Sequence, residues 1–95
     1  MTGRALSVAV LSLALISEPT GARAADPAFC KQYARAALAE VRKALENPRC
    51  GAGLQGMRWS AEFSVHYEWC LGVSADAAGA ERDARSHDLT ACAGR

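Results

Sequence analysis

The segment DPAFCKQYARAALAEVRKALENP, residues 26–48, decides the fold because it carries the signals for both ends of one helix. Asp26 can cap the first turn, Pro27 suits the first helical position, and Asn47-Pro48 ends the helix. At 100° per residue, one side of this helix is apolar and the opposite side is charged. The apolar stripe consists of Cys30, Tyr33, Ala34, Ala37, Leu38, Val41, Ala44 and Leu45, and the charged side of Lys31, Arg35, Arg42 and Glu46. We therefore predict an amphipathic helix that buries Cys30 against the rest of the domain.

Residues 1–24 have the layout of a secretory signal peptide. Arg4 gives a positive start, an apolar run follows from Ala5 to Ile16, and Ala22-Arg23-Ala24 matches the small-residue cleavage pattern. The apolar run is too short to cross a membrane, which takes about 20 residues. We predict that residues 1–24 are removed on export and that residues 25–95 form one domain in the periplasm or outside the cell.

The charge of the predicted mature chain is balanced. Arg4 and Arg23 are two of the 11 basic residues and Glu18 is one of the 10 acidic ones, so nine of each sign remain after cleavage. A net charge near zero argues against electrostatic capture of nucleic acid or of an anionic membrane. We expect the partner to be a protein or another component of the cell envelope.

The four cysteines, Cys30, Cys50, Cys70 and Cys92, all lie in the predicted mature part. An even number of cysteines in a short exported domain indicates disulfides. A domain of this size has a marginal apolar core, and each disulfide adds roughly 2–4 kcal/mol to its stability. We therefore expect the cysteines to act as crosslinks.

The stretch FSVHYEW, residues 63–69, fits two kinds of secondary structure. It alternates apolar and polar residues as a strand does, but no second run of this kind could pair with it. One helical face from Trp59 to Cys70 also collects Phe63, His66 and Tyr67. We predict a second helix here.

A third helix is expected between Ser74, which can cap it, and Gly94, which follows it. Its inner stripe is weak for a core, because Glu81 and Arg85 stand where apolar residues would be expected. These two residues, together with Arg58, can form a partly buried clasp between helices or an ordinary solvated pair, and the sequence leaves both open.

Two disulfide pairings are compatible with three helices. Joining Cys30 to Cys50 would bridge most of the first helix, roughly 25–30 Å, whereas a disulfide needs Cα atoms within about 7 Å. The same argument excludes Cys70 to Cys92. An up-down-up bundle gives Cys30–Cys70 with Cys50–Cys92, and antiparallel first and third helices give Cys30–Cys92 with Cys50–Cys70. Adjacency of consecutive helices slightly favours the first, and the predicted fold is an all-α, three-helix domain with two disulfides.

Two motifs that suggest a cofactor or a reaction are weak. Gly51, Gly53 and Gly56 have the spacing of a dinucleotide-binding loop, but a helix precedes them and the domain is too short for the sheet that such a site needs, so we expect no cofactor. Glu62 and His66 are four residues apart and could form half of a general base, or a metal site, without a nucleophile or a metal-binding motif beside them. The simpler interpretation is that His66 packs between helices and hydrogen-bonds Glu62 or a carbonyl.

The candidate partner-binding residues are Arg58, Trp59, His66 and Trp69. Exposed tryptophans can anchor a partner, although here they can equally fill a core made largely of alanine. The expected function is that of a small non-enzymatic binding protein of the cell envelope. The alternatives are a small enzyme or metal site centred on His66 and Glu62, and an inhibitor or immunity-like protein.

The cysteines and a few other residues form a pattern that covers nearly all of residues 25–95. It comprises Cys30-x2-Tyr33-Ala34, Cys50-Gly51, Gly56-x-Arg58-Trp59, His66-x2-Trp69-Cys70 and Glu81-x3-Arg85-x3-Leu89-x2-Cys92. The pattern resembles a group of small exported four-cysteine proteins of proteobacteria, apart from Met57, where a proline would be expected. That group is uncharacterised, so the resemblance implies an exported helical domain and no activity.

Overall fold

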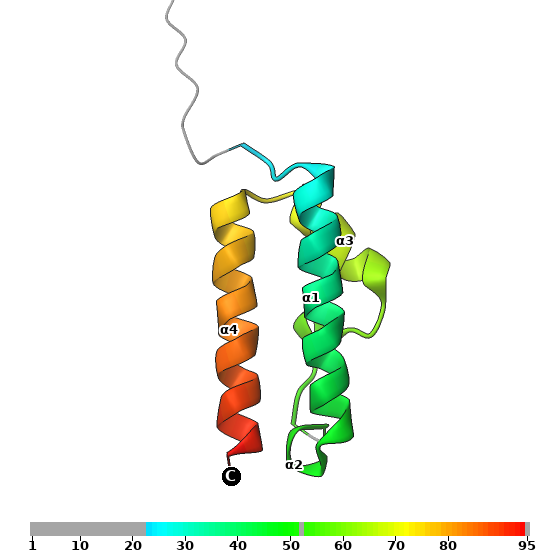
Figure 1. Ribbon diagram of the computed structural model, residues 1–95, viewed down its shortest axis with the longest axis vertical. Coiled ribbons are helices and arrows are strands. Elements are labelled where there is room, and N and C mark those ends of the chain that lie inside the picture. Colours follow the sequence, from blue (N-terminus) through cyan, green and yellow to red (C-terminus); the bar gives the residue numbers. More distant parts are fainter. Residues whose placement is uncertain (1–22, 52, 95) are drawn as a thin grey trace, which may run out of the picture.

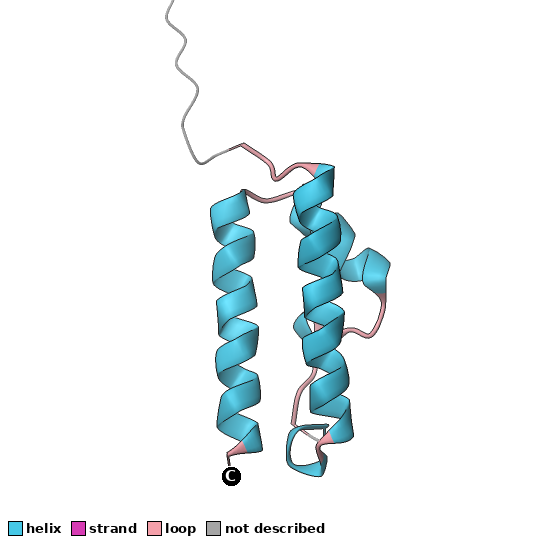
Figure 2. Ribbon diagram, viewed as in Figure 1, coloured by secondary structure: helices cyan, strands magenta, loops and turns pink. Residues whose placement is uncertain are grey.

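The computed structural model describes residues 23–51 and 53–94, which form four α-helices and one 3-10 helix (Figures 1 and 2). The elements are α1 (Pro27–Glu46), α2 (Pro48–Gly51), η1 (Met57–Trp59), α3 (Phe63–Leu71) and α4 (Ala75–Ala93). The predicted all-α fold is confirmed, with α2 and η1 as additional short turns in the loop after α1. The predicted signal peptide lies outside the described residues except for Arg23 and Ala24.

The ends of α1 are set by the residues that the sequence indicates. The Asp26 carboxylate accepts a hydrogen bond of 2.8 Å from the backbone N–H of Phe29, and the helix ends where Asn47 becomes extended. Most of the predicted apolar stripe is buried, but Leu45 is 63% exposed. The reason is the short length of α3, which accompanies only the first part of α1 (Figure 1).

The three longer helices run down, up and down again in the view of Figure 1. Helices α1 and α4 lie side by side and point in the same direction (Figure 1). Helix α3, which comes between them in the sequence, runs in the opposite direction. Cys30 is bonded to Cys70 at the end where α1 begins, and Cys50 to Cys92 at the end where α4 finishes. This connectivity is the first of the two pairings that the sequence leaves open.

Helix α3 begins later than the aromatic stripe predicts. Arg58 and Trp59 belong to η1, and Ser60 is extended, with its hydroxyl accepting a hydrogen bond of 3.1 Å from the backbone N–H of Glu62. Trp59 therefore does not share a helical face with His66. The loop before η1 turns at Gly56, whose φ of 95° is a conformation that side chains other than glycine rarely adopt.

The apolar core has two parts. We call the first the Cys30–Cys70 cluster: it comprises Ala25, Cys30, Tyr33, Cys70 and Ala78, flanked by Phe29, Tyr67, Trp69, Leu71 and Val73. The second, the Cys50–Cys92 cluster, comprises Ala44, Cys50 and Cys92, flanked by Leu54, Trp59 and Leu89. Between them along α4 lies the wholly buried Arg85. No helix in residues 23–51 and 53–94 has the length and apolar content of a membrane span.

Candidate functional site

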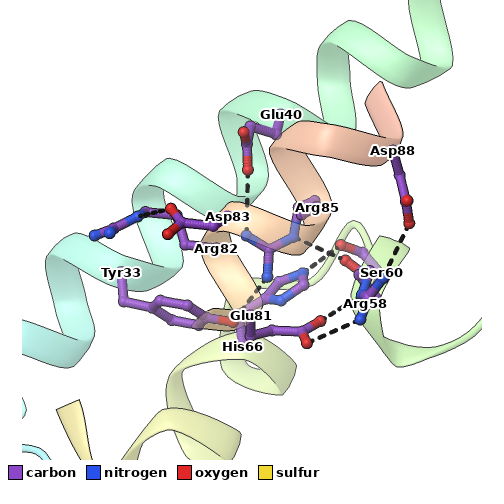
Figure 3. A network of polar contacts seen from close by, with 10 residues as sticks. All are labelled: Tyr33, Glu40, Arg58, Ser60, His66, Glu81, Arg82, Asp83, Arg85 and Asp88. Carbon is purple, nitrogen blue, oxygen red and sulfur yellow. Dashed lines mark hydrogen bonds and ion pairs between the residues drawn. The ribbon is translucent and has the colours of Figure 1, made fainter. Parts of the chain in front are cut away.

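Arg85 on α4 ties together three elements of the domain. Its Nη2 donates to the hydroxyl of Tyr33 at 2.7 Å and its Nη1 to the carboxylate of Glu40 at 3.3 Å, both on α1. Its Nε donates to the backbone carbonyl of Arg58 at 3.2 Å (Figure 3). A buried charge is tolerated only when it is paired and hydrogen-bonded, so these partners fix where α4 lies relative to α1 and η1.

Arg58 makes a second clasp to α4, at the edge of the first. Its Nε and Nη2 donate to the two carboxylate oxygens of Glu81 at 2.6 and 3.0 Å, and its Nη1 donates to Asp88 at 2.9 Å. This is the bidentate geometry that makes guanidinium–carboxylate pairs strong, and the hydrogen bonds to Glu81 raise the pKa of Arg58.

The clasp between helices that the sequence left open is therefore formed, but with different partners. Glu81 and Arg85 are one turn apart on α4, yet Glu81 bonds to Arg58 in η1 and Arg85 bonds to α1. The solvated i, i+4 pair is not what holds these two side chains.

His66 is 3% exposed and does not face Glu62. Its Nε2–H donates to the backbone carbonyl of Ser60 at 2.7 Å. Glu62 is the exposed N-cap residue of α3, and no hydrogen bond joins it to His66 within the described residues. Of the two partners considered for His66, the structure gives the backbone carbonyl and not Glu62. In the part of the chain that the structure describes, no three His, Cys, Asp or Glu side chains are grouped so that they could hold a metal ion.

The two tryptophans are half-buried and lie in different clusters. Trp69 packs in the Cys30–Cys70 cluster, with its ring centroid 5.7 Å from that of Tyr33, whereas Trp59 packs against the Cys50–Cys92 cluster. Much of the aromatic stretch is thus core, although Phe63 and the neighbouring Met57 are exposed.

A pocket of about 150 Å³ lies where α1, η1, α3 and α4 meet, and we call it the central pocket. Its apolar lining comes from Tyr33, Met57, Val65 and Trp69, and its polar lining from Arg58, His66, Glu81 and Arg85. Met57 is 62% exposed, so the pocket reaches the surface at this residue. Of the four predicted binding residues, the structure brings Arg58, His66 and Trp69 to this pocket and leaves Trp59 outside it.

Tyr33 connects three parts of the site: it lines the central pocket, belongs to the Cys30–Cys70 cluster and accepts a hydrogen bond from Arg85. Burial raises the pKa of its hydroxyl, and the hydrogen bond from Arg85 opposes this rise. The hydroxyl therefore stays protonated at neutral pH and acts as a neutral hydrogen-bonding group.

Sequence reasoning missed Glu40 and Asp88 as parts of the site and placed Tyr33 only in the buried stripe. The available signal was the presence of two charged residues, Glu81 and Arg85, on the inner face of α4, which require polar partners on the facing elements. Nothing in the local pattern of α1 distinguishes Glu40 from a solvent-facing glutamate.

No protein-family model, curated protein or solved structure matches this chain. The geometry of the central pocket is therefore the basis on which a function is argued.

Proposed function

We propose that this chain is an exported, non-enzymatic binding protein of the cell envelope and that the central pocket is its ligand site. The observation that carries the proposal is that the side chains of a very small domain leave a partly open pocket of about 150 Å³ between four of its elements. Small domains need every apolar contact for stability. A pocket with apolar walls and a few converging polar groups is the usual form of a ligand site.

Two observations support export. Disulfides persist in compartments outside the reducing cytosol, and both pairs of cysteines are joined here. Ala25, which would become the first residue after the predicted cleavage, belongs to the buried core of the described residues: it is 8% exposed and its N–H donates to the carbonyl of Val73 at 2.7 Å.

Binding is favoured over catalysis because the polar groups of the pocket hold one another. Arg58 is engaged by two carboxylates and Arg85 by Glu40 and Tyr33, which gives a rigid rim and floor. Rigid, preorganised walls favour binding because little conformational freedom is lost when a ligand enters.

The experiment is a fragment screen by protein-observed NMR on the exported, oxidised, ¹⁵N-labelled protein. We expect fragments of up to about ten heavy atoms, at millimolar concentration, to shift the signals of Val65, His66 and the Trp69 indole N–H. The substitution Val65→Phe, which fills the pocket, should abolish these shifts.

The matched control is Leu45→Phe, which adds the same ring on the exposed end of α1 and should leave the shifts unchanged. The proposal is contradicted if no fragment shifts the pocket signals, or if Val65→Phe leaves the shifts as they are in the unsubstituted protein.

A further inference from the structure

We infer that the central pocket selects an uncharged free molecule of about the size of benzene that carries one hydroxyl or amide group. This inference rests on the proposed function and adds the chemical class of the ligand. It is carried by the charge balance of the pocket, by two buried polar atoms and by the size of the pocket.

The charges around the pocket are already compensated by one another. Both oxygens of Glu81 accept from Arg58, and the Nη1 of Arg85 is paired with Glu40. The third carboxylate, Asp88, is held by Arg58 and has a side chain 40% exposed to water, so its charge is solvated. An anionic ligand would have to displace Glu81 from Arg58, and a cationic one would have to compete with Arg58 for Glu81. A charge that enters the pocket without such a partner is strongly disfavoured.

Two buried side chains of the pocket lining each have one unused hydrogen-bonding position. The Nε2–H of His66 donates to Ser60, so in the neutral imidazole the Nδ1 atom is an acceptor, and it has no hydrogen-bond partner within residues 23–51 and 53–94. The Tyr33 hydroxyl accepts from Arg85, and its own proton has no acceptor among these same residues. Both side chains line the pocket and are more than nine-tenths buried. A hydroxyl or amide group, which donates and accepts, complements this acceptor and donor together.

The volume and the lining of the pocket determine the size and shape of the apolar part of the ligand. An apolar cavity of about 150 Å³ in another protein accommodates benzene. Here the walls include the rings of Tyr33 and Trp69 and the aliphatic side chains of Val65 and Met57. These groups favour a flat or compact apolar body over a long chain.

The ligand is a free molecule because the surface around the opening of the pocket lacks the apolar patch that forms the core of a protein interface. Stable protein interfaces bury about 800 Å² on each side around an apolar core. The exposed large apolar residues in the described chain are Leu45, Met57 and Phe63, and of these Met57 alone lines the pocket.

The test is a titration of the exported, oxidised protein at pH 7.5, followed by the Trp69 indole N–H signal, with four small benzene derivatives: phenol, toluene, benzoate and benzylammonium. We expect phenol to bind at least about tenfold more tightly than either ion, because each ion brings an unpaired charge. We expect phenol to bind about fivefold more tightly than toluene, which lacks the hydrogen bonds. N-acetyl-tyrosinamide, which carries the same phenol group on a peptide, should bind more weakly than phenol.

The variant Glu81→Gln adds a second test. It removes the carboxylate from the Nε and Nη2 of Arg58, and the exposed guanidinium should then accept benzoate, so the affinity for benzoate relative to that for phenol should rise about tenfold. The matched control is Asp83→Asn, which removes one charge from an exposed position on the same helix and should change neither affinity. The ranking of probes on the unsubstituted protein decides the matter if Glu81→Gln does not fold.

The outcomes separate this inference from the proposed function. If benzoate or benzylammonium binds as tightly as phenol, the ligand class is wrong and the binding site stands. If N-acetyl-tyrosinamide binds as tightly as phenol, the occupant is a side chain of a partner and the inference of a free molecule fails. If none of the probes shifts the Trp69 signal at 10 mM, roughly the weakest binding of interest for ligands of this size, this inference fails, and the proposed function fails with it if the fragment screen also leaves the pocket signals unshifted.

Discussion

The two ends of this domain carry the same kind of crosslink on very different amounts of apolar packing. The disulfides close segments of nearly equal length, with sequence separations of 40 and 42 residues. The Cys30–Cys70 cluster contains five aromatic and large aliphatic side chains around its buried residues, whereas the Cys50–Cys92 cluster contains three. The second end therefore depends more on its disulfide than the first.

The comparison also explains why the centre can hold a pocket. The buried Arg85 lies between the two clusters, so the apolar core is not continuous from one end to the other. Each end is closed by its own disulfide, and the polar contacts between them position four elements around the central pocket. The candidate binding groups therefore lie between the two disulfide-closed ends.

The largest effect is expected when one end loses its crosslink. By restricting the unfolded chain, each disulfide raises the free energy of unfolding by about 4 kcal/mol for loops of this length, which is most of the stability of a small domain. Cys50→Ser with Cys92→Ser should therefore lower the free energy of unfolding more than Cys30→Ser with Cys70→Ser, because fewer apolar contacts remain at that end. Urea denaturation of the two double variants measures the difference, and equal losses would contradict the comparison.

The next largest loss of stability is expected when the hydrogen bonds of Arg85, between the two ends, are removed. Arg85→Met leaves Glu40, the Tyr33 hydroxyl and the Arg58 carbonyl without their common donor, and should lower the free energy of unfolding by about 3–5 kcal/mol. Arg82→Met, on the exposed side of α4, should change it by less than about 0.5 kcal/mol.

Adding Glu40→Leu to Arg85→Met should recover part of the lost stability, since the unpaired carboxylate is removed. If Arg85→Met alone lowers the free energy of unfolding by less than about 1 kcal/mol, the contacts of Arg85 do not hold the middle of the domain together.

The smallest expected effect is a change of stability at high pH, caused by Tyr33, which lies between the Cys30–Cys70 cluster and Arg85. Burial raises the pKa of Tyr33 above its ordinary value of about 10. The folded protein then holds this proton more tightly than the unfolded chain. The stability gained is complete below pH about 10 and is lost as the pH rises through the pKa of the folded state.

Tyr67→Phe leaves Tyr33 as the single tyrosine, so phenolate absorbance reports on it alone. The titration midpoint in the folded protein should lie above the midpoint in denaturant. A midpoint at or below the denatured one would mean that Tyr33 is not buried between the cluster and Arg85.

Local signals in the sequence were sufficient for the helices. Asp26 and Ser74 cap α1 and α4 through the hydrogen bonds that their residue types predict, because a cap involves only neighbours three residues away. The start of α3 was missed by four residues, since the hydroxyl of Ser60 and the extended backbone up to Glu62 compete with the helical pattern.

The site depends on contacts that no local pattern contains. Arg58 and Glu81 are 23 residues apart in sequence, and Arg85 and Tyr33 are 52 apart. The i, i+4 spacing of Glu81 and Arg85 suggested that they pair with each other, but packing of α4 against α1 and η1 gives each a partner with better geometry. Polar residues on an inner helical face thus indicate that a polar layer exists without identifying its partners.

The most direct test of this account is a disulfide map of the protein recovered after export. Trypsin separates the four cysteines into peptides 25–31, 50–58, 59–82 and 86–95, so each pairing gives its own pair of masses without reduction. We predict that 25–31 is joined to 59–82, that 50–58 is joined to 86–95, and that the chain begins at Ala25. Joining of 25–31 to 86–95, or four free thiols, would contradict it.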